Sequence, residues 1–528
     1  MSPVELTAAD TLGLPLLSLV LILPIVFAVL ALFAQDGVQV RRVALVGGAL
    51  ELILASLPLF LIDRDHAGMQ LVERHEWMPS LGVMAQLGVD GLSAPLLALT
   101  ALITLGVIAV GAGPQQRMPQ VWVGAIFTLE TALMGVYTAQ DLIFFFMFWE
   151  MTLIPLHLLT SIYGVGRERG FAANKLVMTM MVGGGVLLLA FLLLGETHRE
   201  LTGLGLSFDP VKLQALDIPL SRQLLLFGLM LIGFGFKAPI FPFHSWMPGL
   251  LQEGSLGVGV LTVGFKLGVY GLLRFVLPLT PDAVVLAAPL LAVLGVSGLF
   301  YGALVALRQE SLRRALAFGG LSHVGFALVG LASLNTQGVQ GAVVCLVNMA
   351  LLSTGVFLLT GFVWLRTRTS ELHQLGGLWA TMPKMSTFFV LLSVAGLGLP
   401  GTSGFIGEHL VLLGAARANP AWALLLAVGA ALGAAWTWRL FQSVIFGRPQ
   451  GDAATATDLR PRELLCVALL AALTLGGGLM PGPLLALTRA PVEGITTRLD
   501  EAAQRAEARQ GEWLVSIGLI NDDLPTQN

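Results

Sequence analysis

The sequence predicts an all-α membrane protein with about 14 transmembrane helices, and three observations carry this prediction. Hydrophobic residues make up 56% of the 528 residues and charged residues only 12%, whereas about 25% of residues are charged in a soluble protein. The mean hydropathy is +0.83. Apolar runs of about 20 residues, the length that crosses the hydrocarbon of a bilayer, recur along the chain. Because lipid offers the backbone no hydrogen-bond partners, we expect these runs to be helices.

The apolar runs place the expected spans along the whole chain. The first run, Leu12 to Phe33, is too long for the apolar region of a signal peptide and follows no basic segment, so we expect it to cross the membrane. The expected spans cover residues 13–34, 42–62, 91–112, 119–138, 141–163, 172–195, 222–247, 255–278, 284–306, 315–333, 338–363, 385–413, 421–446 and 464–487.

The sidedness of the chain follows from its basic residues. An even number of spans puts both termini on the same side. Loops after odd-numbered spans, such as the one with Arg41 and Arg42, hold more Arg and Lys than the opposite short loops. By the positive-inside rule these loops are cytoplasmic, so both termini are predicted on the outer side. We expect the charged tail, roughly Val492 to Trp513, to form a surface helix that is either packed or solvated.

Ionisable residues lie inside the apolar runs. A charged side chain at the centre of a membrane helix costs roughly 2.5–3.5 kcal/mol on insertion scales, so such residues indicate function. They suggest a file of titratable groups that moves protons or cations through lipid. The residues are Glu130, Glu150, Lys237, Lys266 and Glu408.

Two expected spans are interrupted in similar ways. The seventh contains Pro239 and Pro242, and the twelfth contains Pro400 among four glycines. Such breaks predict unwound backbone that lines a cavity, and paired breaks are typical of inverted-repeat transporters. Two ordinary proline kinks are the alternative. We therefore expect a three-span segment (1–112), two inverted five-helix repeats (113–280 and 281–447), a last span (448–490) and a tail (491–528).

The composition also excludes several classes of function. The net charge of −3 gives no reason to expect nucleic acid as a partner. Only Cys345 and Cys466 are present, whereas an iron–sulfur cluster normally needs four thiolates. No metal-binding spacing and no phosphate-binding loop occurs in the sequence. We expect no cofactor in this chain, and the energy source to be a partner or an ion gradient.

At the level of motifs the chain resembles a known family. It contains FFFMFWEMTLIPLHLL, FKAPIFPFHSWMP, LRRALAFGGLSHVGFALVG and GLPGTSGFIGEHLVLLG. These segments resemble the antiporter-like membrane subunits of respiratory complex I. The stretch from Val72 to Leu96 is most similar to subunit M of bacterial NADH-quinone oxidoreductase.

The resemblance implies a role for individual residues. Glu150 and Lys237 correspond to an acid–lysine pair, Lys266 and His323 to relay groups, and Glu408 to the exit acid of a proton path; Glu130 is a weaker candidate. The resemblance also implies a translocase subunit in the bacterial inner membrane with periplasmic termini. Its direct partners would be other membrane subunits and lipid. The neighbouring membrane subunits would connect it to a peripheral redox arm. That arm would hold NADH, FMN, iron–sulfur clusters and the quinone site.

The chain departs from the family pattern at two places. After the seventh span it has MPGLLQEGSLGVG where the family has Pro-Asp-Ala-His, and Met349 replaces a histidine. Alternatives therefore stay open beside the complex I hypothesis. One is a cation/proton antiporter subunit, or a proton-driven subunit of a membrane hydrogenase or an inorganic-carbon uptake complex. Another is a membrane scaffold that no longer conducts.

Overall fold

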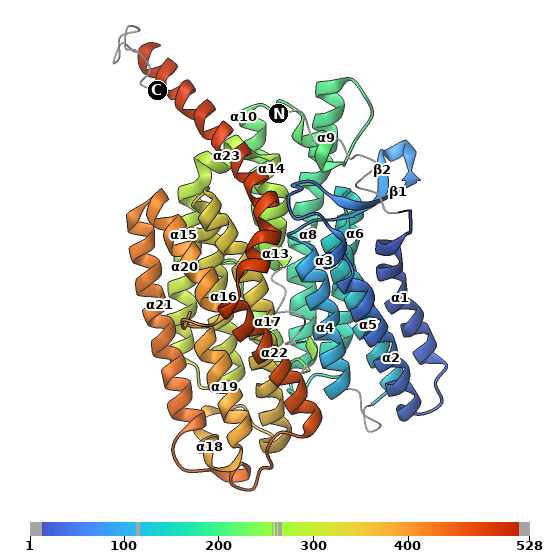
Figure 1. The fold of residues 1–528 in the computed structure, drawn as a ribbon, viewed down its shortest axis with the longest axis vertical. Coiled ribbons are helices and arrows are strands. Elements are labelled where there is room, and N and C mark those ends of the chain that lie inside the picture. The colour runs from blue at the N-terminus through green and yellow to red at the C-terminus, as the bar shows by residue number, and fades with distance from the viewer. Residues whose placement is uncertain (1–12, 112–116, 256, 259–260, 262–266, 517–528) are drawn as a thin grey trace.

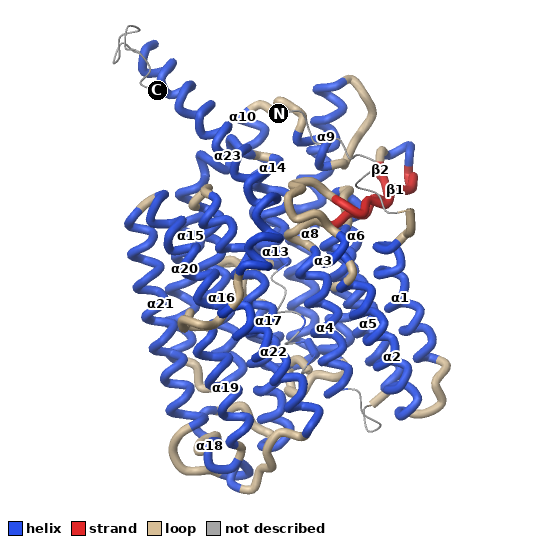
Figure 2. Tube along the Cα trace, viewed as in Figure 1, coloured by secondary structure: helices blue, strands red, loops and turns tan. Residues whose placement is uncertain are grey.

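The computed structural model describes residues 13–111, 117–255, 257–258, 261 and 267–516, and these residues are mostly helical (Figures 1 and 2). The prediction of an all-α membrane protein is confirmed. Eleven described helices are long and apolar enough to cross a membrane, and three shorter apolar helices cover Leu16–Leu32, Leu267–Leu279 and Pro383–Ala395. Each of these segments overlaps one expected span, and the expected span 255–278 lies partly outside the described residues.

The N-terminal part combines four helices with a hairpin that the sequence reasoning did not include. Strands β1 (Gln70–Met78) and β2 (Val83–Val89) pair antiparallel, with Arg74 opposite Gln86. The hairpin lies at one end of the bundle (Figure 2). Glu73 ties it to the first helix, because its carboxylate accepts the Leu17 N–H at 2.6 Å. The helices are α1 (Leu16–Leu32), α2 (Gly37–Ser56), α3 (Pro58–Leu61) and α4 (Ala94–Gly111).

The next group of helices contains the first break. Helix α10 ends at Lys237 and helical structure resumes at Met247. The Trp246 Nε1–H donates to the Phe236 carbonyl at 2.9 Å across this break. The elements are α5 (Pro119–Thr138), α6 (Leu142–Met151), α7 (Leu153–Ser161), α8 (Arg169–Thr202), α9 (Pro210–Gln214), α10 (Leu220–Lys237), α11 (Met247–Glu253), α13 (Leu267–Gly271), the π-helical turn η3 (Leu272–Val276) and α14 (Leu277–Leu279).

The following group contains the second break, between Ala395 and Ser403. Here α16 and α17 form the centre of the bundle, since 94% of the spanning window of each is buried. The helices are α15 (Pro281–Arg308), α16 (Leu312–Ala332), α17 (Thr336–Thr367), α18 (Leu378–Thr381), α19 (Pro383–Ala395), α20 (Ser403–Ala418), α21 (Pro420–Leu440) and α22 (Pro461–Leu479), with a π-helical turn η5 (Phe441–Ile445) after α21.

The tail forms one long helix, α23 (Gly482–Ser516), which continues through Pro491. It packs against α15 and α17 and ends beyond the same end of the bundle as the hairpin (Figure 1). Val492 and Leu499 are buried, and Arg505 pairs with Asp282 at 3.0 Å. The expected surface helix is therefore packed on the bundle along its first half, and the solvated alternative is wrong there.

Candidate functional site

Glu150 lies in the last turn of α6, at the step between α6 and α7. Asp141 begins α6 by accepting the Ile143 N–H at 2.9 Å and the Phe144 N–H at 3.1 Å. At the other end, one carboxyl oxygen of Glu150 is buried without a hydrogen-bond partner. Gly184 of α8 leaves space for this carboxyl, because a Cβ at that position would overlap its Oε1.

Lys237 reaches toward Glu150 but does not form an ion pair with it. Its ammonium group donates to the Trp149 carbonyl and lies 4.0 Å from the centre of the Trp149 ring, which is a favourable cation–π arrangement. The charges of Lys237 and Glu150 still interact electrostatically. The lysine thus contacts Trp149, the residue before Glu150, and the Trp149 carbonyl and indole hold it there.

Aromatic rings line one side of this acid–lysine pair. The ring of Phe145 lies 4.6 Å from that of Phe275, and Trp149 packs edge-on against Phe234 at 5.3 Å. All four side chains are buried. Such a wall excludes water, and charges interact more strongly where water is excluded.

His323 and Glu408 form a second polar site, in the part of the chain with the second break. His323 lies on α16 and Glu408 on α20, and His323 Nδ1 is 3.8 Å from Glu408 Oε1. Gly398, whose φ is +67°, leaves space for this acid, since a Cβ there would lie 2.5 Å from Glu408 Oε2. The unwound backbone of the break therefore leaves room for the Glu408 carboxyl, as expected for backbone that lines a cavity.

His323 also lines a cavity of about 60 Å³, which is enough for a few water molecules. Polar side chains from α17, α19 and α21 contribute to its wall, and Asn348 is held there by the Ser403 hydroxyl at 2.6 Å. Met349 lines the same cavity. The apolar side chain that departs from the family pattern thus lies beside His323. The lining includes Gly320, His323, Asn348, Met349, Ser353, Ser393 and Thr437.

The structure brings the predicted residues together in two groups and separates others. Glu150 meets Lys237, and His323 meets Glu408. Lys266 lies outside the described residues. Glu130 is on α5 and fully buried; it faces Thr104 and interacts with Glu51. Sequence reasoning missed Glu51, although an acid inside the second expected span was a visible signal.

His244 is a further titratable residue close to these two groups. It lies within the first break, and its ring is 4.9 Å from that of Tyr301 on α15 and 6.2 Å from that of Phe318 on α16. Its Nδ1 is buried without a hydrogen-bond partner. His244 therefore lies between the first break and α16, the helix that carries His323. In the sequence, its position between Pro242 and Trp246, within the interrupted seventh span, indicated a functional role.

In the stretch MPGLLQEGSLGVG, where the chain also departs from the family pattern, an acid contacts the backbone of another loop. Glu253, the only acid of that stretch, ends α11, and its carboxylate accepts the Glu168 N–H at 2.9 Å. Its own carbonyl accepts the Val165 N–H at 2.8 Å. Glu253 thus holds the loop before α8 in place.

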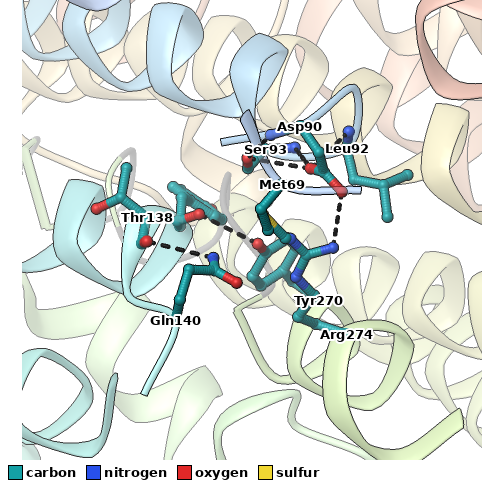
Figure 3. A network of polar contacts seen from close by, with 9 residues as sticks. Met69, Asp90, Leu92, Ser93, Thr138, Gln140, Tyr270 and Arg274 are labelled. Carbon is teal, nitrogen blue, oxygen red and sulfur yellow. Dashed lines mark hydrogen bonds and ion pairs between the residues drawn. The ribbon is translucent and has the colours of Figure 1, made fainter. Parts of the chain in front are cut away.

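Arg274 belongs to a buried network between the N-terminal segment and the π-helical turn η3 (Figure 3). It pairs with Asp90 Oδ2 at 2.7 Å, and Asp90 accepts the Leu92 and Ser93 N–H groups at 3.0 Å. The Tyr270 hydroxyl donates to the Tyr137 carbonyl at 3.3 Å. A π-helical turn is rare and often marks a functional region. Here the π-helical turn directs Arg274 toward Asp90, so this arginine has a structural role: it links η3 to the N-terminal segment.

Broken helices with ionisable groups at their ends define the class of an ion-translocating membrane protein. The comparison with known families agrees. Residues 139–433 match the family described as "NADH:quinone oxidoreductase/Mrp antiporter, TM". The match covers more than half of the chain and extends from before Glu150 to beyond Glu408. The chain therefore belongs to this family of antiporter-like membrane subunits.

Individual relatives agree with the complex I branch of the family. NAD(P)H-quinone oxidoreductase chain 4 1 of Synechococcus sp. (strain JA-2-3B'a(2-13)) is 36% identical over 487 residues, which are 90% of this chain and 91% of the relative. NAD(P)H-quinone oxidoreductase chain 4 of Acaryochloris marina (strain MBIC 11017) is 33% identical over 529 residues, with 96% and 97% covered. The resemblance predicted from the motifs is confirmed.

Solved structures show the same fold. A chain of respiratory complex I from Thermus thermophilus with bound NADH superposes with a TM-score of 0.83 at 30% identity, over 92% of this chain and 99% of that chain. A chain of the Mrp complex from Dietzia sp. DQ12-45-1b superposes with a TM-score of 0.81 at 20% identity, over 93% of this chain and 100% of that chain. The second likeness concerns the fold alone.

Proposed function

We propose that this chain is a proton-translocating membrane subunit of a complex I-type NADH:quinone oxidoreductase, and that protons cross it along Glu150, Lys237, Lys266, His323 and Glu408. One observation carries the residue-level proposal. Lys237 rests on the Trp149 carbonyl and indole while a Glu150 oxygen beside it has no hydrogen-bond partner. The acid and the lysine thus form a pair that a small movement can close.

Closing and opening this pair changes how firmly Lys237 holds its proton. A nearby carboxylate stabilises a charged lysine, and burial away from water favours the neutral lysine. When Glu150 approaches, Lys237 keeps its proton; when Glu150 withdraws, Lys237 releases it. The surrounding aromatic wall strengthens this effect because it excludes water. A charge change in a neighbouring subunit that moves Glu150 would therefore drive one proton step.

The second polar site completes the path. His323 Nδ1 and Glu408 Oε1 are 3.8 Å apart, so a small approach of the two side chains, or a water molecule from the cavity that His323 lines, would let them exchange a proton. His244 offers a further titratable group between the breaks. We propose that residues 113–280 hold the switching pair, that residues 281–447 hold the exit, and that Glu408 releases protons toward the periplasm. Both chain termini then face the periplasm, which follows from the basic loops.

The redox chemistry belongs to other subunits in this proposal. NADH, FMN, the iron–sulfur clusters and the quinone would bind to partners, and this chain would be coupled to them through neighbouring membrane subunits. The relatives named as NAD(P)H-quinone oxidoreductase chains support this assignment.

A second candidate function rests on the cavity beside His323. Met349 lines this cavity, and a thioether cannot relay protons. This observation favours a diverged copy that serves another proton-driven or antiporter complex. Co-purification from mild detergent separates the two functions. Companion subunits that bind NADH, flavin and iron–sulfur clusters support the first function, and a partner set without them supports the second.

Lys237→Ala tests the residue-level proposal. We expect this variant to lose donor-driven proton transport in membrane vesicles, because the substitution removes the cation that Glu150 would switch. Lys212→Ala is the control, since Lys212 lies on the short helix α9 outside the apolar spans. Transport by the Lys237→Ala variant at the level of the Lys212→Ala variant would show that the scheme is wrong.

A further inference from the structure

Glu51 and Glu130 are acids that the proposed path does not use, and both lie in the middle of membrane helices. Glu51 is on α2 and Glu130 on α5, and both are 0% exposed. None of their four carboxyl oxygens has a hydrogen-bond partner. Both residues also precede the range 139–433 that matches the family. They form a separate polar site in the N-terminal part of the chain.

A third polar group points at the same place. Thr104 lies on α4, which packs against both α2 and α5, and its hydroxyl is fully buried without a hydrogen-bond partner of standard geometry. This hydroxyl faces the Glu130 carboxyl, and the Glu51 and Glu130 carboxyls interact with each other. Two acids and a hydroxyl from three helices that pack against one another thus share one buried polar region.

No cation compensates these acids among the described residues. Helices α1 and α4 contain no charged residue, and α5 contains no Lys or Arg. Arg41 and Arg42 are on α2, but they precede Glu51 by at least nine residues, which is about 14 Å along a helix at 1.5 Å per residue. Arg41 interacts with Arg462 at that end of the bundle.

Other titratable groups on neighbouring elements lie against other parts of the chain. On α17 and α22, Arg366 and Glu463 pair with each other at 2.5 Å, and Cys466 contacts the Gly106 carbonyl at 4.0 Å. On α6 and α7, Glu150 lies against Gly184 of α8, and His157 contacts Asn174 at 3.1 Å. The hairpin acid Glu73 is satisfied by Leu17 and Ser18.

We propose that Glu51 and Glu130 form a proton-binding site in which the two carboxyls share a proton and Thr104 donates to the pair. Two carboxylates without donors cannot both stay ionised in hydrocarbon, because burial and mutual repulsion both disfavour the second charge. A proton removes one charge and supplies the missing donor. The site is separate from the Lys237 path and does not rest on the proposed function.

A carbodiimide is the chemical probe for this site, because it reacts with protonated carboxyls in apolar surroundings. The carboxyl oxygen bonds to the central carbon of the carbodiimide and the acid proton moves to one nitrogen, giving an O-acylisourea that rearranges to a stable N-acylurea. No atom is lost, so the adduct is identified by its mass. We would treat the intact complex in native membranes with dicyclohexylcarbodiimide at pH 7 and map adducts by mass spectrometry.

We expect adducts at Glu51 or Glu130, increasing as the pH is lowered, and their complete loss in the double variant Glu51→Gln/Glu130→Gln. Glu73 is the matched control. It is also buried, but it accepts the Leu17 N–H at 2.6 Å and the Ser18 N–H at 3.0 Å, which stabilise its carboxylate. It should stay unmodified. Equal modification of Glu73 would contradict the proposal.

Infrared spectroscopy gives an independent measurement that needs no reagent to enter the site. The C=O stretch of a protonated carboxyl is expected in the wild-type spectrum, lost in the double variant and shifted by Thr104→Val. Absence of this band overturns the proposal, whatever the labelling result. Protection from labelling by sodium chloride but not by choline chloride would also overturn it, because the pair would then hold sodium in place of a proton.

Discussion

Gly184→Ala offers a way to move Glu150 without changing any charge. The added Cβ would fall about 1 Å inside the 3.4 Å at which ordinary contact with Glu150 Oε1 begins. The carboxyl is the free end of a flexible side chain, so it is expected to move by that amount. Gly185→Ala in the same helix is the control, because nothing lies within 4 Å of its added Cβ.

The size of the effect follows from the electrostatics of the pair. Two unit charges about 5 Å apart interact by about 3 kcal/mol at an effective dielectric constant of about 20, and a shift of about 1 Å changes this by about 0.5 kcal/mol. That change corresponds to about a twofold shift in the equilibrium between closed and open pairs. Proton transfer depends more steeply on geometry, since a displacement of about 1 Å can cost as much as about 100-fold. We therefore expect transport to fall at least twofold.

The assay compares both variants with the wild type in inside-out membrane vesicles. Electron transfer is started with the donor of the complex, and proton uptake is followed by quenching of a pH-sensitive acridine dye, normalised to the amount of chain. Both substitutions raise helix propensity equally, by about 0.5–1 kcal/mol, so stability does not separate them. Equal transport by Gly184→Ala and Gly185→Ala would refute the placement of Glu150 in the switching pair.

Three further predictions concern other parts of the molecule. Arg274→Gln leaves Asp90 buried and unpaired, so the complex should lose about 3–5 kcal/mol of stability, seen as a lower Tm; Arg489→Gln, which breaks an exposed, solvent-screened pair with Glu493, should leave the Tm almost unchanged, and similar losses in the two variants would contradict the buried network. Gly398→Ala should lower proton transport more than Gly476→Ala, because a Cβ at Gly398 would lie 2.5 Å from Glu408 Oε2 whereas one at Gly476 meets nothing within 4 Å; equal transport would argue against Glu408 as the exit acid. Asp141 lies just before the span Leu142–Ser161, and burial raises its pKa from 3.8 to about 6. Because its folded-state pKa is raised, the stability that its protonated form contributes is present below about pH 4 and lost as the pH rises through 6. The free energy of unfolding of the wild type should therefore fall over this range by up to about 3 kcal/mol relative to Asp141→Asn, and its Tm should fall with it. Parallel profiles of Tm against pH would show that Asp141 does not titrate there.

Several features of the protein follow from the sequence alone. The spans were predictable because hydrocarbon thickness sets a minimum length for each helix. The breaks beside Lys237 and Glu408 were predictable because proline and glycine interrupt helices wherever they occur. The motifs around Glu150 and His323 were sufficient to indicate the family that the comparison confirmed.

The tertiary structure decided which of these groups meet. Lys237 contacts the carbonyl of Trp149, 88 residues earlier in the chain, and His323 meets Glu408 on another helix. Arg274 pairs with Asp90, which lies far earlier in the chain. Glu51, one acid in an apolar run, gained a neighbour in Glu130 only through the packing of α2, α4 and α5. Span length and helix breaks depend on local backbone and lipid contacts, which the sequence specifies directly. The pairing of buried charges depends on how helices rotate and pack against one another, and only the assembled bundle determines that.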